Sequence, residues 1–167
     1  MNELKLQTAS VRLRSAKLVE LHEDRDVLLA HHEALLLEGD ASIALVRAYA
    51  QACRWFVWKA EDEAVLGILL LQALEIRNLA VEPAFRGLGH GRAMLEALVA
   101  QLKSERRTGE CVTLGTGDAP STRRFYKRCG FCEVGRIANY FPTHYDKPIV
   151  EDGRVLRDQV RFAHVIE

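Results

Sequence analysis

Residues 79–91, LAVEPAFRGLGHG, are followed directly by RAMLEALVAQL, and this junction organises the whole sequence. An apolar stretch typical of a strand ends where Pro83 interrupts it. Glycines then stand at every second position, 87, 89 and 91, before apolar residues recur at the spacing of an amphipathic helix. The junction therefore predicts a strand, a glycine-rich loop and a helix N-terminus, in that order.

Such a junction suits an anionic ligand. A helix N-terminus carries backbone N–H groups without intrahelical partners and the positive end of the helix dipole. Glycines let a phosphate approach those groups closely, because no Cβ stands in the way. A loop whose glycines only permit a tight turn would have the same composition, so both interpretations stay open on the glycines alone.

Two phosphate-binding motifs do not fit the loop. A P-loop requires GxxxxGK followed by Ser or Thr, and the sequence contains none. A dinucleotide fingerprint requires its third glycine at position 92, which is Arg92, and a strand that ends at the first glycine. A dinucleotide-dependent oxidoreductase is therefore disfavoured, although NAD(H) binding would revive it.

Composition limits the remaining possibilities. The 167 residues suit one domain, and we expect a single domain over 1–167. Lys plus Arg and Asp plus Glu number 23 each, so the balanced charge gives no reason to expect a nucleic-acid or membrane partner. The first 20 residues lack the apolar core of a secretory signal. We expect a cytoplasmic protein whose four cysteines are reduced.

Periodicity predicts alternating helices and strands. We expect a helix over 19–37 that Gly39 ends, and a second helix that Asp40 or Ser42 caps. A β-hairpin follows, and then the strand of the glycine junction and its helix. The predicted ranges are 54–60 and 64–74 for the hairpin, 74–81 for the strand, 89–107 for the helix, 111–115, 131–141 and 155–166 for later strands, and 119–129 for a short helix.

A third phosphate pattern fits the loop. Arg86, Gly89 and Gly91 match Arg/Gln-x-x-Gly-x-Gly/Ala, and LAVEPAFRG precedes them while FYKRCGF follows later. With these motifs the chain resembles the GNAT superfamily of acyl-CoA-dependent N-acetyltransferases, most specifically over residues 76–131. The resemblance implies an α/β (α+β) fold: a mixed, mostly antiparallel central sheet of about six or seven strands with helices on both faces.

The resemblance also implies acetyl-CoA, or coenzyme A, as cosubstrate. In the family the loop and the helix start bind the pyrophosphate through backbone N–H groups. Backbone N–H groups near Leu79 and Val81 polarise the thioester carbonyl, an oxyanion-hole arrangement. Many members have an asparagine where this chain has Ala119, and the Ser121 hydroxyl could replace that contact. The expected cofactor-binding residues are Leu79, Ala80, Val81, Arg86, Gly87, Leu88, Gly89, His90, Gly91, Arg92, Ser121 and Tyr126.

Two residues are candidates for catalysis. Tyr126 matches the tyrosine with which many family members protonate the departing thiolate, and the alternative is that it only packs or hydrogen-bonds the cofactor sulfur. Because an aliphatic amine is mostly protonated at neutral pH, a general base is also expected. Glu75 is our candidate, since some members carry a glutamate base there. Its alternative is a carboxylate that pairs with Arg77 or is solvated.

For other polar residues the sequence gives less reason to expect a redox, metal-binding or phosphate-binding role. Cys129 and Cys132 form CGFC at the end of a helix rather than at its start, so we expect buried thiols and no metal site. His31 and His32 suit an exposed helix face. The basic residues Arg123, Arg124, Lys127 and Arg128 either attract the cofactor 3′-phosphate or are solvated.

The polar segment over 141–153 either lines the acceptor pocket or forms a subunit contact. Its candidate contacts, counting the residue just before the segment, are Tyr140, His144, Tyr145 and Asp146. A hairpin turn at Glu151-Asp152-Gly153 would favour a mainly structural role for that end.

These observations lead to one main hypothesis. The protein would transfer acetyl from acetyl-CoA to a primary amine, of a small molecule or of a peptide or protein, by direct attack in a ternary complex. The alternative is a non-catalytic sensor module that binds CoA or acyl-CoA. A homodimer is expected only because dimers are the commonest soluble oligomers.

Overall fold

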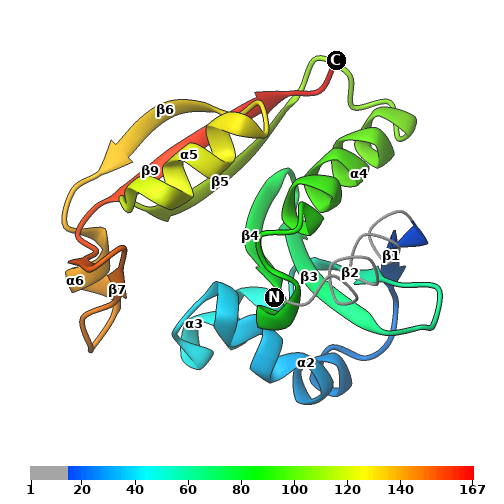
Figure 1. Ribbon diagram of the computed structural model, residues 1–167, viewed down its shortest axis with the longest axis horizontal. Coiled ribbons are helices and arrows are strands. Elements are labelled where there is room, and N and C mark those ends of the chain that lie inside the picture. The colour runs from blue at the N-terminus through cyan, green and yellow to red at the C-terminus, as the bar shows by residue number, and fades with distance from the viewer. Residues whose placement is uncertain (1–14) are drawn as a thin grey trace. The chain divides into compact units, whose positions relative to one another are not determined.

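The computed structural model describes residues 15–167, in which the elements follow the order in Figure 1. The described residues divide into two compact units: residues 15–73 with 77–101, and residues 74–76 with 102–167. Seven strands form one sheet in the order β1-β2-β3-β4-β5-β9-β6, so the predicted fold class is confirmed. The expected lack of a secretory signal concerns a segment that falls mostly on residues 1–14, outside the described residues.

The first unit is built on an antiparallel ladder with helices on both of its faces. Its strands are β1 (Lys17–Leu21), β2 (Arg54–Lys59), β3 (Val65–Gln72) and β4 (Glu75–Val81), of which β4 begins in the second unit. Its helices are α2 (Arg25–Gly39), α3 (Ile43–Ala50) and α4 (His90–Ser104), and η1 (Pro83–Phe85) is a single 3-10 turn.

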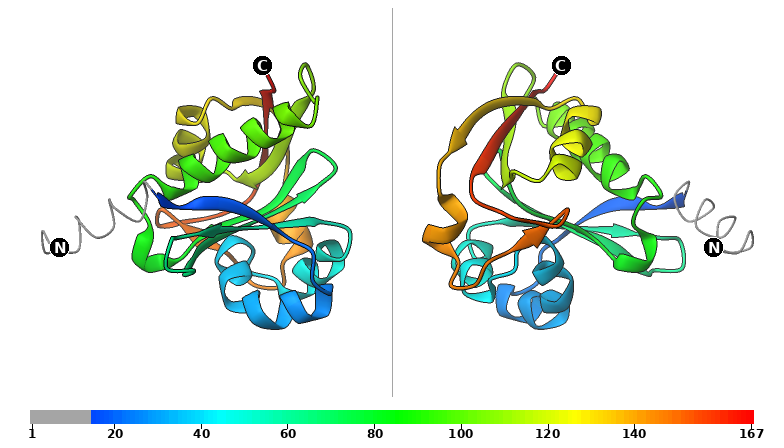
Figure 2. Two further views of the ribbon diagram at one scale, coloured as in Figure 1. Left: turned by 90° about the vertical axis from the view of Figure 1, so that its right-hand side faces the viewer. Right: turned by 60° about the vertical axis from the view of Figure 1, so that its left-hand side comes forward.

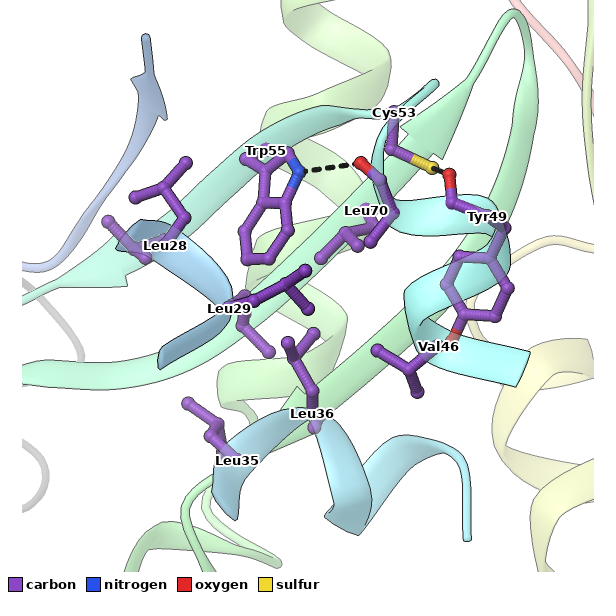
Figure 3. Packing of buried hydrophobic residues seen from close by; sticks show 13 residues of the cluster. Leu28, Leu29, Leu35, Leu36, Val46, Tyr49, Cys53, Trp55 and Leu70 are labelled. Atoms are coloured by element: carbon purple, nitrogen blue, oxygen red, sulfur yellow. Dashed lines mark hydrogen bonds between the residues drawn. The ribbon is translucent and has the colours of Figure 1, made fainter. Parts of the chain in front are cut away.

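Alternation along β2 and β3 divides the apolar side chains between the two faces. Trp55 and Val57, with Ile68 and Leu70, pack against α2 and α3 in the cluster drawn in Figure 3. On the other face Gly67 lies against Met94 of α4. The Trp55 indole N–H donates to the carbonyl of Ala50 at 3.0 Å, which satisfies the polar atom of this buried ring.

The helix predicted over 19–37 is wrong at its start. Residues 17–21 form β1, where Val19 pairs antiparallel with Val57. The helix begins only after Asp24, whose carboxylate accepts from the amides of Asp26 and Val27. Strand pairing with β2, which no local pattern reveals, overrides the helical spacing here. The second helix does begin at a predicted cap, Ser42.

The second unit combines β5 (Cys111–Gly117), β6 (Cys132–Ile137) and β9 (Gln159–Val165) with the helix α5 (Pro120–Arg128). Figure 1 and Figure 2 show α5 running along one face of these strands. The short helix α6 (Tyr140–His144) and the hairpin of β7 (Val150–Glu151) and β8 (Arg154–Val155) come between β6 and β9.

The strand predicted over 131–141 is too long. β6 ends at Ile137, Asn139 takes the left-handed conformation at φ 54°, and Tyr140 and Phe141 begin α6. Asparagine tolerates that conformation better than most residues, so the chain can turn there. By contrast, the predicted turn at Glu151-Asp152-Gly153 is confirmed, with positive φ at Asp152 and Gly153.

None of the helices in the described part has the length and apolar character that a membrane crossing requires. The cytoplasmic location and the homodimer stay predictions from the sequence.

The close packing at Gly67 gives a stability prediction. A Cβ at this position would come within 2.8 Å of the Ala80 carbonyl oxygen and of the Met94 sulfur. We expect Gly67→Ala to lower the free energy of unfolding by about 1–3 kcal/mol, because strand and helix must shift apart. Urea unfolding measures the change. The matched control is Gly135→Ala in β6, where the nearest atom would lie at 3.8 Å and the change should stay within about 0.5 kcal/mol. Equal effects in both variants would contradict the steric argument.

Candidate active site

The loop between η1 and α4 combines left-handed backbone with the start of a long helix. Gly87 has a φ of 73° and Gly89 a φ of 89°, values that L side chains rarely adopt. The first intrahelical bond joins the Ala93 amide to the Gly89 carbonyl at 3.0 Å. The amides of the three preceding residues, 90–92, therefore have no acceptor within the helix. They lie at the positive end of a 15-residue helix.

This arrangement fits a phosphate group. A Cβ at Gly87 would meet no heavy atom within 4 Å, so the loop is open on that side. The backbone amides can donate to an anion there without moving a side chain. The turn itself also requires glycine at positions 87 and 89, because both residues have positive φ. The tight-turn interpretation therefore describes these two positions as well. The two interpretations are compatible, because one backbone serves both purposes.

Arg86 holds the loop rather than projecting from it. Its Nε donates to the Val81 carbonyl at the end of β4 at 3.0 Å, and its Nη2 pairs with the Glu38 carboxylate of α2. The guanidinium thus ties the end of β4, the loop and α2 together. Its expected contact with the cofactor stays a prediction.

The side chain of His90 is buried inside the first unit, with 1% of its surface exposed. The Trp58 indole N–H, which can only donate, reaches its Nδ1 at 3.1 Å. Nδ1 must therefore accept, and the imidazole is neutral with its proton on Nε2. Burial lowers the pKa of His90 below its usual value. Since the ring faces inward, only the backbone amide of His90 is left to contact a ligand.

The strand β4 is fixed by a buried polar network that the sequence analysis missed. The Asn78 side chain is 3% exposed, and its Nδ2 donates to the Leu36 carbonyl at 3.0 Å and to the Tyr49 hydroxyl at 3.1 Å. That hydroxyl donates to Asp40, and burial raises the pKa of Tyr49. The available signal was an asparagine at a position that alternation places on the same face as Ile76 and Ala80. The network anchors the strand whose next residue is Leu79.

Tyr126 of α5 lies in an aromatic cluster of the second unit. Its ring is packed against Phe131 and Phe162, with ring centroids 5.9 and 5.6 Å away. Burial raises the pKa of the phenol, so the hydroxyl stays protonated over the whole physiological range. That hydroxyl has no hydrogen-bond partner within residues 15–167, which leaves it able to donate to a ligand.

Glu75 pairs with an arginine that is distant in sequence. Its Oε1 accepts from Nη1 of Arg161 on β9 at 2.8 Å. Arg77, the partner considered from the sequence, instead donates to Gln72 at 2.9 Å and lies over the Tyr49 ring. Glu75 is 34% exposed at its side chain, so the carboxylate is neither fully solvated nor buried. Its role as a base stays a prediction.

The Ser121 hydroxyl has a partner within the second unit. It donates to Asp152 at 2.7 Å, and the Ser121 amide donates to the same carboxylate at 2.8 Å. The amide and then the hydroxyl of Ser121 lower the pKa of Asp152. The β7–β8 hairpin therefore caps the N-terminus of α5, which supports a structural role for this end of the tail. A cofactor contact by Ser121 would have to compete with Asp152.

Side-chain positions bear on two further expectations, those for the thiols and for the basic residues of α5. Of the four thiols only Cys53 is buried; Cys111 and Cys132 are exposed and Cys129 is intermediate, so the expectation of buried thiols is wrong for the CGFC pair. Most residues of β6 are exposed, and its first residue, Cys132, is exposed with them. The basic cluster on α5 is partly paired, since Arg123 reaches Glu133 at 2.8 Å and helps to lower the pKa of that carboxylate. Within residues 15–167, no group of three or more potential metal ligands is found.

Comparison with known proteins identifies a family model and relatives that resemble this chain. Residues 51–133 match a family model described as an acetyltransferase (GNAT) domain. The uncharacterised N-acetyltransferase YvbK of Bacillus subtilis strain 168 is 30% identical over 133 residues, which cover 77% of this chain and 84% of that protein.

Solved structures agree with the family match. An IAA acetyltransferase from Bacillus cereus has a TM-score of 0.79 and 29% identity, and the match covers 90% of this chain and 99% of the other. A Bacillus subtilis acetyltransferase in complex with CoA has a TM-score of 0.75 and 27% identity, with 90% and 98% covered.

The buried imidazole of His90 gives a prediction on pH. Its folded pKa lies below the ordinary 6.5, so the unfolded chain binds the proton more readily. Stability from this group is therefore present above pH 6.5 and is lost as the pH falls below it. We expect the wild type to lose more unfolding free energy than His90→Gln between about pH 7.5 and 5.5. Urea titrations at both pH values test this, and parallel losses would contradict it.

Proposed function

The chain belongs to the GNAT family of acetyltransferases, and on that premise we propose that it transfers the acetyl group of acetyl-CoA to a primary amine by direct attack. The observation that carries the proposal is the loop before α4, with its left-handed glycines and the amides that precede the helical ladder. A diphosphate carries the charge that such a helix start favours. The relative from Bacillus subtilis that was solved with CoA supports the same ligand.

Binding would use the backbone more than side chains. The amides of residues 87–92 would donate to the pyrophosphate, while Arg86 keeps the loop attached to β4 through the Val81 carbonyl. We propose that backbone N–H groups near Leu79 and Val81 donate to the thioester oxygen as it gains charge. The buried Asn78 network would hold that stretch of β4 in place.

The amine must lose a proton before its lone pair can attack the acetyl carbon. We propose that Glu75 receives this proton, directly or through a water. Attack forms the C–N bond and leaves a positively charged nitrogen. The tetrahedral intermediate collapses as the C–S bond breaks, the nitrogen releases its second proton to solvent to give the amide, and solvent later returns a proton to Tyr126. The amine attacks the thioester directly in this scheme, so no covalent acyl-enzyme forms.

The departing thiolate needs a proton, and we propose that Tyr126 donates it. The phenol is protonated throughout the physiological range because burial raises its pKa. A phenol with a raised pKa is a poor acid toward a thiolate in water. In the apolar surroundings of Tyr126, however, burial disfavours the charged thiolate as it disfavours the phenolate. The thiolate therefore becomes a stronger base, and a short hydrogen bond can share the proton between the two groups.

The first prediction concerns the loop. We expect Gly89→Val to raise the dissociation constant for acetyl-CoA by about a hundredfold or more, because a side chain at φ 89° distorts the cradle and obstructs the phosphate. Isothermal titration with acetyl-CoA, CoA and NADH measures this. Gly109→Val is a matched control with the same φ of 89°, in a turn outside the loop. Absence of acetyl-CoA binding in the wild type, or tight NADH binding in its place, would overturn the assignment.

The second prediction concerns the acid. We expect Tyr126→Phe to lower kcat by about a hundredfold or more while the acetyl-CoA dissociation constant changes by less than about threefold. Thiol release in single-turnover and steady-state assays measures the rates. An unchanged kcat over the pH range would remove Tyr126 from the reaction. A sensor module would bind acetyl-CoA in both proteins and release no thiol from either.

A further inference from the structure

One face of the second unit gathers the polar side chains of Glu75, Gln159 and Arg161. The register pairs Glu75 with Thr113 on β5, and Gly115 on β5 with Arg161 on β9. Residues two apart on a strand share a face, so Glu75 and Arg161 lie on the same side of these strands. Leu114 and Phe162 point to the opposite side, where Phe162 meets Tyr126 of α5.

Arg161 is held in place from within this face. Its Nη1 donates to Glu75 Oε1 at 2.8 Å and to Gln159 Oε1 at 3.3 Å, which uses both hydrogens of that nitrogen. The Gln159 amide lies where a Cβ of residue 115 would be, since its atoms would come within 2.4–2.7 Å of one. Gly115 therefore makes room for the glutamine that steadies the guanidinium.

The ion pair leaves binding capacity on both partners. Elsewhere in the chain Arg54 and Glu20 form a two-point pair, Nε with Oε1 and Nη2 with Oε2, both at 2.8 Å. Arg161 and Glu75 make a single contact instead. Within the described residues, Nε and Nη2 of Arg161 and Oε2 of Glu75 have no partner. The two side chains are 28% and 34% exposed, so a small ligand can reach them.

We propose that Glu75 and Arg161 together bind a zwitterionic acceptor, an amine that carries a carboxylate on a neighbouring carbon, as an α-amino acid does. The ammonium would lie at the free oxygen of Glu75 and the carboxylate at the free donors of Arg161. Opposite charges already adjacent in the protein match a ligand with adjacent opposite charges. This inference rests on the proposed function, in which Glu75 takes the proton of the amine.

The experiment compares acceptors that differ only in the carboxylate. Common L-amino acids and their amides would be assayed by thiol release, with putrescine as a carboxylate-free amine. We expect wild type to prefer the best amino acid over its amide in kcat/KM. In Arg161→Gln this preference should fall by about 10- to 100-fold, the size of a charge-assisted contact, mainly through KM of the amino acid. Each substrate is compared between wild type and Arg161→Gln, so the difference in basicity between the amino acid and its amide cancels.

Control variants separate recognition from folding. Arg136→Gln on β6 removes an arginine that pairs with Asp158, outside the proposed site, and should leave the preference unchanged. Arg161→Lys keeps the charge without the planar fork and should retain part of the preference, which tests the proposal if the glutamine variant unfolds. Equal losses for the amino acid and its amide would overturn the proposal, as would a wild type that acetylates putrescine and no amino acid.

A binding measurement distinguishes this proposal from the proposed function. The same L-amino acids are titrated calorimetrically into wild type and Arg161→Gln, each saturated with CoA. If wild type binds an amino acid, Arg161→Gln does not, and neither protein shows turnover, the zwitterion site is supported and the proposed transfer reaction is contradicted. Absence of amino-acid binding in wild type, with amine-dependent turnover on other acceptors, would overturn the site and leave the transfer reaction in place.

Discussion

The backbone between β4 and α4 must pass through left-handed conformations at Gly87 and Gly89, and the site described above depends on that constraint. The turn ends β4 and starts α4 within a few residues, so the amides of the helix start come close in sequence to the strand that ends at Val81. Two side-chain contacts keep the turn in place. Arg86 ties it to β4 and α2, and Trp58 holds the inward-facing ring of His90. These contacts fix the backbone whose amides we propose as donors to the pyrophosphate.

The local sequence predicts elements well where the pattern and the conformational requirement coincide. The glycine junction, the Ser42 cap and the turn at Asp152-Gly153 each depend on a few adjacent residues, and each is confirmed. The failures come where distant strands decide. Val19 is a strand residue because it pairs with Val57, and the exposure of Cys132 follows from how little covers β6. Pairing partners and coverage are properties of the assembled chain.

The same distinction separates the parts of the site. The conformation of the loop was predictable because it depends on the backbone of one continuous segment. The partners of Glu75 and Ser121 were not, because Arg161 and Asp152 lie 86 and 31 residues away in sequence. No spacing rule joins residues at such separations. Asn78 gave a weak signal, a polar residue on the face of the strand that also carries Ile76 and Ala80, and its meaning appears only with Tyr49 and Leu36 beside it.

Strand alternation also separates the two groups to which we assign opposite proton transfers. Glu75 shares a face with Thr113 and Arg161, whereas Tyr126 packs against Phe162 on the other face of the same strands. In the reaction that we propose, the carboxylate accepts from the incoming amine and the phenol donates to the departing thiolate, so the acetyl group must lie where both side chains can reach it. The β5–β9 register that sets this alternation is therefore a chemical constraint as well as a structural one, because a shift of one residue would bring Arg161 to the aromatic face and remove the partner of Glu75.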